Sequence, residues 1–115
     1  MADYTQPRVT HSLGAANDAL VFTAEGRDGN ELSNFLVLQL DDIGTLTISF
    51  EARVPGESAW EAIAGTDVTD STATNVTSTT ADGLWRFDVA GLDFRARVSA
   101  YTSGTVNATG NFVKG

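Results

Sequence analysis

The chain has 115 residues, no cysteine, one histidine and a formal net charge of −8. This length fits a single domain, and the lack of cysteine excludes a disulfide scaffold, a thiolate zinc site and a thiol nucleophile. Seven basic residues scattered among fifteen acidic ones do not form the clustered cationic surface that nucleic acids require, so we expect no nucleic-acid binding.

Residues 1–17 contain Pro7 and Gly14 and few large apolar side chains, which is typical of a flexible arm. This start has neither the basic n-region nor the apolar h-region of a signal peptide. We therefore expect synthesis in a cytoplasm without export by the usual route. The longest apolar stretch is short and is interrupted by Gln39, so we expect no membrane span. The arm, residues 1–17, is followed by one domain, residues 18–115.

Short segments rich in β-branched and aromatic residues begin near residue 19. Residues 19–24 and 34–40 are separated by a turn sequence at 25–30. Residues 34–40 are apolar at nearly every position, which favours a central strand covered on both faces. Residues 45–53 alternate apolar and polar side chains most regularly, which predicts a half-buried strand.

Shorter strands follow a Pro-Gly turn. Residues 59–63 predict a short strand, and the Thr- and Ser-rich residues 71–80 predict an edge strand with a polar outer face. Apolar and polar side chains alternate with a period of two along residues 84–89, 92–100 and 105–112. These alternations predict three more half-buried strands in the second half of the chain.

About eight strands at spacings of roughly eight to twelve residues, with turn signals between them, predict an all-β fold. We expect a single antiparallel β-sandwich of the jelly-roll or Ig-like type, preceded by the flexible N-terminal arm. Regular alternation places Ala100 on the inner face of its strand. The turn at residues 101–104 predicts a hairpin between the last two strands.

Candidate catalytic and metal-binding residues are few. The only histidine, His11, falls in the predicted arm, where nothing would fix the geometry of a hydrolytic triad. Asp41 and Asp42 are adjacent in a turn, whereas a glycosidase needs two acids across a cleft. Residues 28–31 lack most of the ligands of a calcium loop. We therefore expect no enzymatic activity, no metal and no cofactor.

Three aromatic residues, Trp60, Trp85 and Tyr101, are the candidates for stacking against a sugar ring. The alternative interpretation is structural. In that case Trp85 packs with Phe87 on the same face, and Trp60 plugs one end of the sandwich. We favour the structural interpretation.

Charged side chains also alternate along two of the predicted strands. Arg95 and Arg97 share the polar face of one strand, and Glu51 and Arg53 share that of another. Cross-strand pairs among them would hold the register at roughly a few tenths of a kcal/mol each. We interpret these residues as structural.

The order of several segments along the chain is shared by a known class of proteins. The order is residues 47–53, a Pro-Gly turn, residues 60–65 and residues 83–106, and the most specific segment of this pattern is VAGLDFRARVSAYTSG. Over residues 45–112 the chain thus resembles small β-sandwich structural proteins of tailed bacteriophages, some of which decorate capsids as cement proteins. In that pattern a Ser-Asp-Gly often precedes the Trp, where this chain has residues 55–58, Pro-Gly-Glu-Ser.

The resemblance implies a non-enzymatic virion protein. We predict a capsid decoration (cement) protein on the outer surface of a phage head, with the major capsid protein of the same virion as its partner. By analogy it forms a homo-oligomer, which we take to be a trimer. The predicted capsid contact lies in the arm, because an arm gains order when it adds a strand to a sheet edge or fills a groove. It comprises Tyr4, Thr5, Gln6, Pro7, Arg8 and Val9.

Two alternatives share the predicted fold. One is a carbohydrate- or host-surface-binding module on a phage head or tail, which would expose Trp60, Trp85 and Tyr101 in a shallow groove. The other is a further structural component of the tail, neck or fibre base. Exposure of the three aromatic rings distinguishes the first alternative from a decoration protein.

Overall fold

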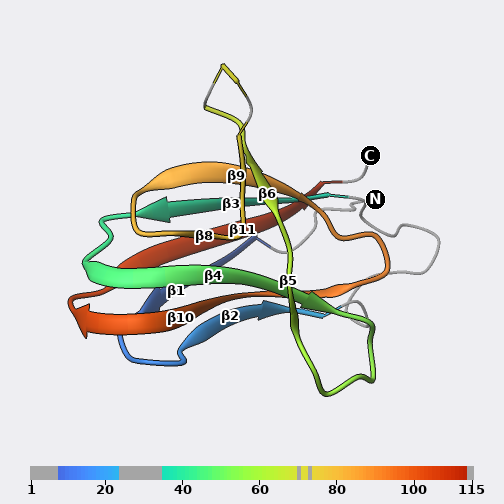
Figure 1. The fold of residues 1–115 in the computed structure, drawn as a ribbon, viewed down its shortest axis with the longest axis horizontal. Coiled ribbons are helices and arrows are strands. Elements are labelled where there is room, and N and C mark those ends of the chain that lie inside the picture. Colours follow the sequence, from blue (N-terminus) through green and yellow to red (C-terminus); the bar gives the residue numbers. More distant parts are fainter. Residues whose placement is uncertain (1–7, 24–34, 70, 73, 114–115) are drawn as a thin grey trace.

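The computed structural model describes residues 8–23, 35–69, 71–72 and 74–113, with only the backbone of 8–11, 112 and 113. It consists of two antiparallel β-sheets packed face to face, so the predicted all-β sandwich is confirmed (Figure 1). In the described part of the chain there is no helix with the length and apolar content needed to cross a membrane.

Six strands form the larger sheet and five form the smaller one. The larger sheet has the order β1 (Arg8–Leu13), β11 (Val106–Val113), β3 (Phe35–Asp41), β9 (Gly83–Asp88), β6 (Gly65–Asp67) and β7 (Asn75–Val76). The smaller sheet has the order β2 (Ala19–Phe22), β10 (Asp93–Ser103), β4 (Thr45–Arg53) and β5 (Glu61–Ala62), and β8 (Ser78–Thr79) also pairs with β4.

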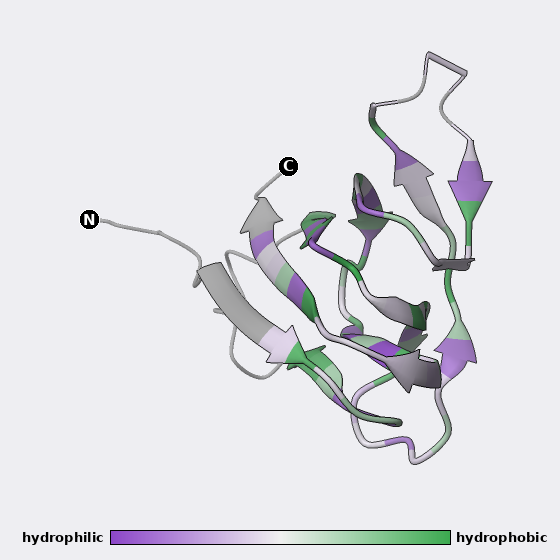
Figure 2. Ribbon diagram, turned by 90° about the vertical axis from the view of Figure 1, so that its left-hand side faces the viewer, coloured by the Kyte–Doolittle hydropathy of each residue, from purple (hydrophilic) through white to green (hydrophobic). Residues whose placement is uncertain are grey.

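The core lies between the two sheets and is built from alternate residues of each strand, as the banded hydropathy along the ribbons illustrates (Figure 2). Its centre is aromatic: the Phe50 ring lies 5.5 Å from Trp85 and 4.8 Å from Phe87, and Phe87 lies 4.7 Å from Phe94. Each such buried side chain stabilises the fold by about 1.5–3 kcal/mol relative to exposure. The strong alternation predicted for residues 45–53 is confirmed by β4, whose even-numbered residues are buried.

The predicted arm overlaps the sandwich. Residues 8–13 form β1, which pairs with β11 from Arg8 opposite Asn111 to Leu13 opposite Val106. The boundary at residue 17 is therefore corrected for this segment. β1 is held at the sheet edge by backbone pairing, which requires no run of large apolar side chains, so composition alone did not reveal it. Residues 1–7 lie outside the described residues.

β3 is central, between β11 and β9, but only one of its faces is buried. Leu36, Leu38 and Leu40 face the core, whereas Gln39 is exposed. The prediction of a strand covered on both faces was wrong, because in a two-layer antiparallel sandwich each sheet is covered only once. The Thr-rich residues 71–80 contain two short strands, β7 and β8, which belong to different sheets.

The last two strands do not form a hairpin. β10 pairs with β2 and β4, and β11 pairs with β1 and β3, so the turn after Ser103 carries the chain from one sheet to the other. Gly104 adopts a φ of 86°, which favours glycine. The turn packs tightly, since a Cβ built on Gly44 would lie 2.7 Å from the Ser103 carbonyl oxygen. A turn sequence indicates a change of direction but not which sheet the next strand joins.

Register shifts change the side-chain alternation along β10. One shift lies between Val98 and Ala100, and a second follows further along the strand. Val98 is buried opposite Ile48, but Ala100 lies opposite the outward-facing Thr47 and is exposed. The prediction that Ala100 faces the core was wrong, because an extra residue in a bulge reverses the phase of the alternation.

Candidate functional site

The outer face of the five-stranded sheet carries two side-chain groups that are candidates for function. The arginine cluster comprises Glu51, Arg53, Trp60, Asp93, Arg95 and Arg97. The threonine groove comprises Gly44, Thr45, Leu46, Thr47, Thr80, Ala100 and Thr102. Both groups lie along β4 and β10, whose inward residues build the core and leave the intervening residues facing outward.

Glu51 is the centre of the arginine cluster. Its Oε1 accepts hydrogen bonds from Arg95 Nε at 2.6 Å and Arg97 Nε at 3.0 Å, and its Oε2 accepts one from Arg97 Nη2 at 3.0 Å. Glu51 and Arg95 are directly opposite each other in the β4–β10 register. The predicted cross-strand pairing of these residues is therefore confirmed. The Arg97–Glu51 pair uses two parallel N–H donors, the stronger geometry for a carboxylate.

These contacts shift the protonation of both partners. The hydrogen bond from Arg97 lowers the pKa of Glu51 below its usual value; burial of the carboxylate opposes this shift, and Arg95 adds to it through a hydrogen bond and its charge. The same hydrogen bond raises the pKa of Arg97. Glu51 is therefore a carboxylate held in its charged form, which suits a structural tie between strands and does not suit a general acid.

Trp60 lies against this cluster on the outer face of the sheet and is not part of the core between the two sheets. The guanidinium carbons of Arg53 and Arg95 lie 4.3 and 4.4 Å from the centre of its ring. Arg53 also donates from Nε to Asp93 at 3.1 Å. The prediction that Trp60 plugs one end was wrong, because two outward-facing arginines offer the indole cation–π contacts on the sheet face.

The three aromatic residues considered as candidates for a stacking platform are not brought together. Trp85 is 4% exposed and packs in the core, where it and Phe87, from the same strand, both contact Phe50. This confirms the structural interpretation of Trp85. Tyr101 is 39% exposed, and its hydroxyl donates to the Gly104 carbonyl oxygen at 3.2 Å.

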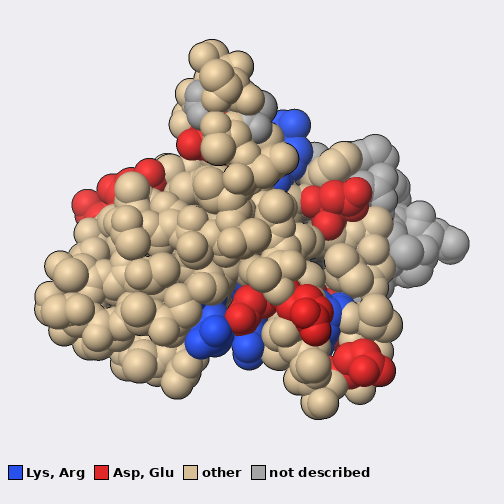
Figure 3. All heavy atoms as spheres, in the orientation of Figure 1, with Lys and Arg blue, Asp and Glu red and all other residues tan. Residues whose placement is uncertain are grey.

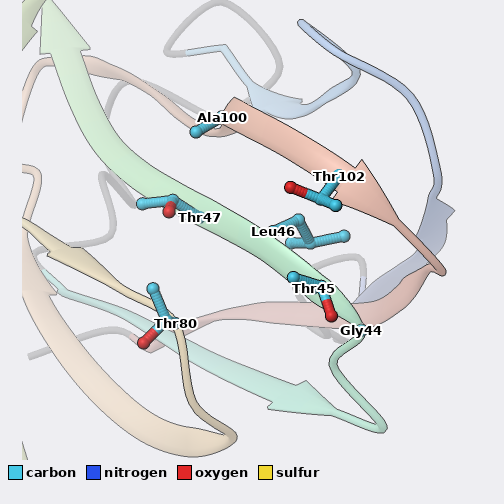
Figure 4. A pocket seen from close by; sticks show the side chains of 7 residues that line it. All are labelled: Gly44, Thr45, Leu46, Thr47, Thr80, Ala100 and Thr102. Carbon is cyan, nitrogen blue, oxygen red and sulfur yellow. The ribbon is translucent and has the colours of Figure 1, made fainter.

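The threonine groove is a shallow hollow of about 340 Å³ on the outer face of β4 and β10. Figure 4 shows Thr45 and Thr47 on β4, Ala100 and Thr102 on β10, and Thr80 on the separate segment that follows β8. Sequence reasoning missed this groove, because it depends on the bulges of β10 and on Thr80 approaching from a distant part of the chain.

The remaining candidate residues lie elsewhere. Asp42 has a φ of 55° in the β3–β4 turn, and the Asp82 carboxylate accepts from the backbone N–H groups of Asp42 and Ile43 at 3.2 and 2.9 Å. The predicted turn position of Asp42 is confirmed, but the carboxylate that binds the turn backbone is that of Asp82, which comes from a distant part of the chain. The backbone of His11 lies in β1, whereas residues 4–7 and 28–31 fall outside the described residues. Among the side chains described, no group of three or more His, Cys, Asp or Glu could hold a metal ion.

The fold and its polar outer face define the chain as a two-layer antiparallel β-sandwich protein. No protein-family model matches the chain, and no curated protein matches it. Two solved structures share its fold. The SPBc2 prophage-derived protein YomS superposes with a TM-score of 0.67 at 20% identity, covering 96% of each chain. The PBSX exported protein XepA superposes with a TM-score of 0.66 at 20% identity, covering 91% of this chain and 38% of that one. The chain is thus structurally similar to prophage-derived β proteins.

Proposed function

We propose that this chain is a non-enzymatic virion structural protein that acts as a capsid decoration (cement) protein on the outer surface of a phage head. The observation that supports this most is the shared fold with prophage-derived YomS over 96% of both chains. The specific segment VAGLDFRARVSAYTSG, on which the phage resemblance rests, corresponds to the Val89–Leu92 turn, β10 and Gly104.

The physical properties of the sandwich suit this role. A cement protein must be rigid, and here an aromatic core joins two sheets whose longest strand, β10, has eleven residues. It must also stay soluble at high concentration, which the net charge of −8 promotes. Copies that bind only the assembled shell raise the shell's stability through linkage.

The six residues predicted as the capsid contact, Tyr4 to Val9, fall into two parts. Arg8 and Val9 lie in β1, where they pair with Asn111 and Gly110. Tyr4–Pro7 precede this edge strand in the sequence. In our proposal Tyr4–Pro7 bind the major capsid protein, and β1 anchors them to the sandwich.

Co-sedimentation with empty shells tests the proposal. We expect the intact chain to bind shells and to raise their temperature of heat disruption. Deleting residues 2–7 leaves β1 in place and should reduce binding at least tenfold; a Gly-Ser replacement of equal length, as a matched control for spacing, should behave like the deletion. No binding by the intact chain contradicts the decoration role. Unchanged binding by the deletion contradicts the arm contact alone. Light scattering on the free chain tests the proposed trimer.

A further inference from the structure

We propose that the threonine groove is a binding site for a neutral saccharide. The groove lies on the five-stranded sheet, whereas β1, which follows the proposed capsid contact in the sequence, belongs to the six-stranded sheet. The inference does not depend on a position on the phage head. None of its seven lining residues has a charged side chain, and four of them are threonines, each with a hydroxyl and a methyl group.

The groove hydroxyls are available to a ligand. In the part of the chain that the structure describes, the side chains of Thr45, Thr47, Thr80 and Thr102 make no hydrogen bond. In contrast, the hydroxyls of Thr66, Thr69 and Thr79 bond to neighbouring groups of the chain. A threonine hydroxyl both donates and accepts, as does a saccharide hydroxyl. The groove therefore presents four such groups on one concave face.

The backbone beneath the groove favours a saccharide over a polypeptide. Thr45 pairs with Ser103 and Thr47 pairs with Ala100, so the floor of the groove is the β4–β10 ladder. A ligand lying on this face meets side chains, whereas an extended peptide is recognised through main-chain hydrogen bonds at a sheet edge. The groove thus offers little to a peptide and hydroxyl groups to a sugar.

The charge distribution selects an uncharged ligand. The lining contains no ionisable side chain, and the surface over the start of β4 and the tip of β10 carries no charged group (lower left of Figure 3). The net charge of −8 repels anions from the molecule as a whole. Ala100 and the threonine methyl groups supply apolar surface against which the C–H groups of a sugar ring can pack (Figure 4).

The bulges of β10 form the side of the groove that lies across β4 from Thr80. With regular alternation after the buried Val98, both Ala100 and Thr102 would face inward. The register shift after Val98 turns Ala100 to the outer face, opposite Thr47. Thr102 lies within the second shift, between Tyr101 and Ser103, and lines the groove together with Ala100 and Thr80. Bulges are common beside functional sites, where they redirect side chains.

The size of the groove predicts weak binding by one chain. About 340 Å³ is near the lower end of the range of roughly 300–1,000 Å³ for ligand pockets, and the groove is shallow, so we expect a millimolar Kd. On a particle that carries many copies, avidity would strengthen binding to a polysaccharide by roughly a hundredfold or more.

An NMR titration of the purified chain with a panel of neutral mono- and oligosaccharides tests the proposal. We expect shifts of backbone amide signals confined to residues 44–47, 80 and 100–102. The substitutions Thr47→Val and Thr102→Val preserve shape and remove one hydroxyl each, and each should weaken binding about threefold to tenfold. Thr77→Val is the matched control, because Thr77 is exposed outside the groove with no side-chain hydrogen bond in the described part of the chain.

Three results would overturn the proposal: no shift at the groove amides with any member of the panel, equal binding by Thr47→Val and the unaltered chain, or binding only of acidic saccharides or uncharged peptides. Because the titration uses no shells, its failure leaves the decoration role intact. Conversely, failure of shell binding leaves the groove proposal intact.

Discussion

Replacing Glu51 with Gln tests the energetic role of the arginine cluster. Glu51 accepts three hydrogen bonds from two guanidinium groups, and its side chain is 14% exposed while those of Arg95 and Arg97 are each 24% exposed. A buried hydrogen bond to a charged group makes a net contribution of about 1.5–3 kcal/mol to stability, whereas an exposed ion pair contributes about 0–1 kcal/mol. The partial exposure here lies between these limits, so we expect a loss of about 1–2 kcal/mol.

This loss can be measured as a change in Tm. An unfolding entropy of about 2.1 cal/mol/K per residue over 115 residues gives a change of about 4 °C per kcal/mol, hence a decrease of roughly 4–8 °C at neutral pH. Glu57→Gln is the control, because it removes the same charge from an exposed residue and should change stability by less than about 0.5 kcal/mol.

The pH dependence provides a second test of the same pair. In the folded chain the hydrogen bond from Arg97 lowers the pKa of Glu51 below its usual value. The stabilising contribution is therefore complete above that value and is lost as the pH falls through the folded-state pKa. The difference between Glu51→Gln and the unaltered chain should vanish in acid. Equal stability at neutral pH, or a difference that persists undiminished in acid, would refute the reasoning.

Three further predictions follow from the packing. Phe50→Ala should lower the free energy of unfolding by about 3–5 kcal/mol in a denaturant titration, because the ring is fully buried between Trp85 and Phe87; a loss below 1 kcal/mol would contradict the aromatic core. Gly44→Ala should cost about 1–3 kcal/mol in thermal unfolding, because the new methyl group meets backbone atoms of the β10–β11 turn; an unchanged Tm would show that the two turns do not touch. Acrylamide should quench the fluorescence of Trp85→Phe, which retains the half-buried Trp60, more than that of Trp60→Phe, which retains the buried Trp85; the reverse order would contradict the placement of both indoles.

The parts of the fold that depend on side-chain periodicity could be predicted from the sequence. The alternation along residues 45–53 required one buried face and therefore defined β4. The same alternation placed Glu51, Arg95 and Arg97 on outer faces, where opposite charges on adjacent strands pair. Trp85 was likewise predicted correctly, since it alternates with the exposed Arg86 and shares its face with Phe87.

The parts that depend on tertiary placement could not be predicted. Whether the strand after Gly104 joins the same sheet is decided by the packing of the whole sandwich and not by the turn residues. A bulge leaves little trace in composition, so the exposure of Ala100 and the groove it lines were missed. Trp60 was misplaced because its position depends on Arg53 of β4 and Arg95 of β10, which are distant from it or from each other in the sequence.

Imaging of the native phage particle tests the decoration role most directly. Electron cryomicroscopy should reveal a body with the dimensions of this sandwich, 41 × 35 × 23 Å along its principal axes, repeated at symmetry-related positions on the outer surface of the head, with both sheets fitting the density. Density for the sandwich confined to the tail, or its absence from purified particles, would contradict the account.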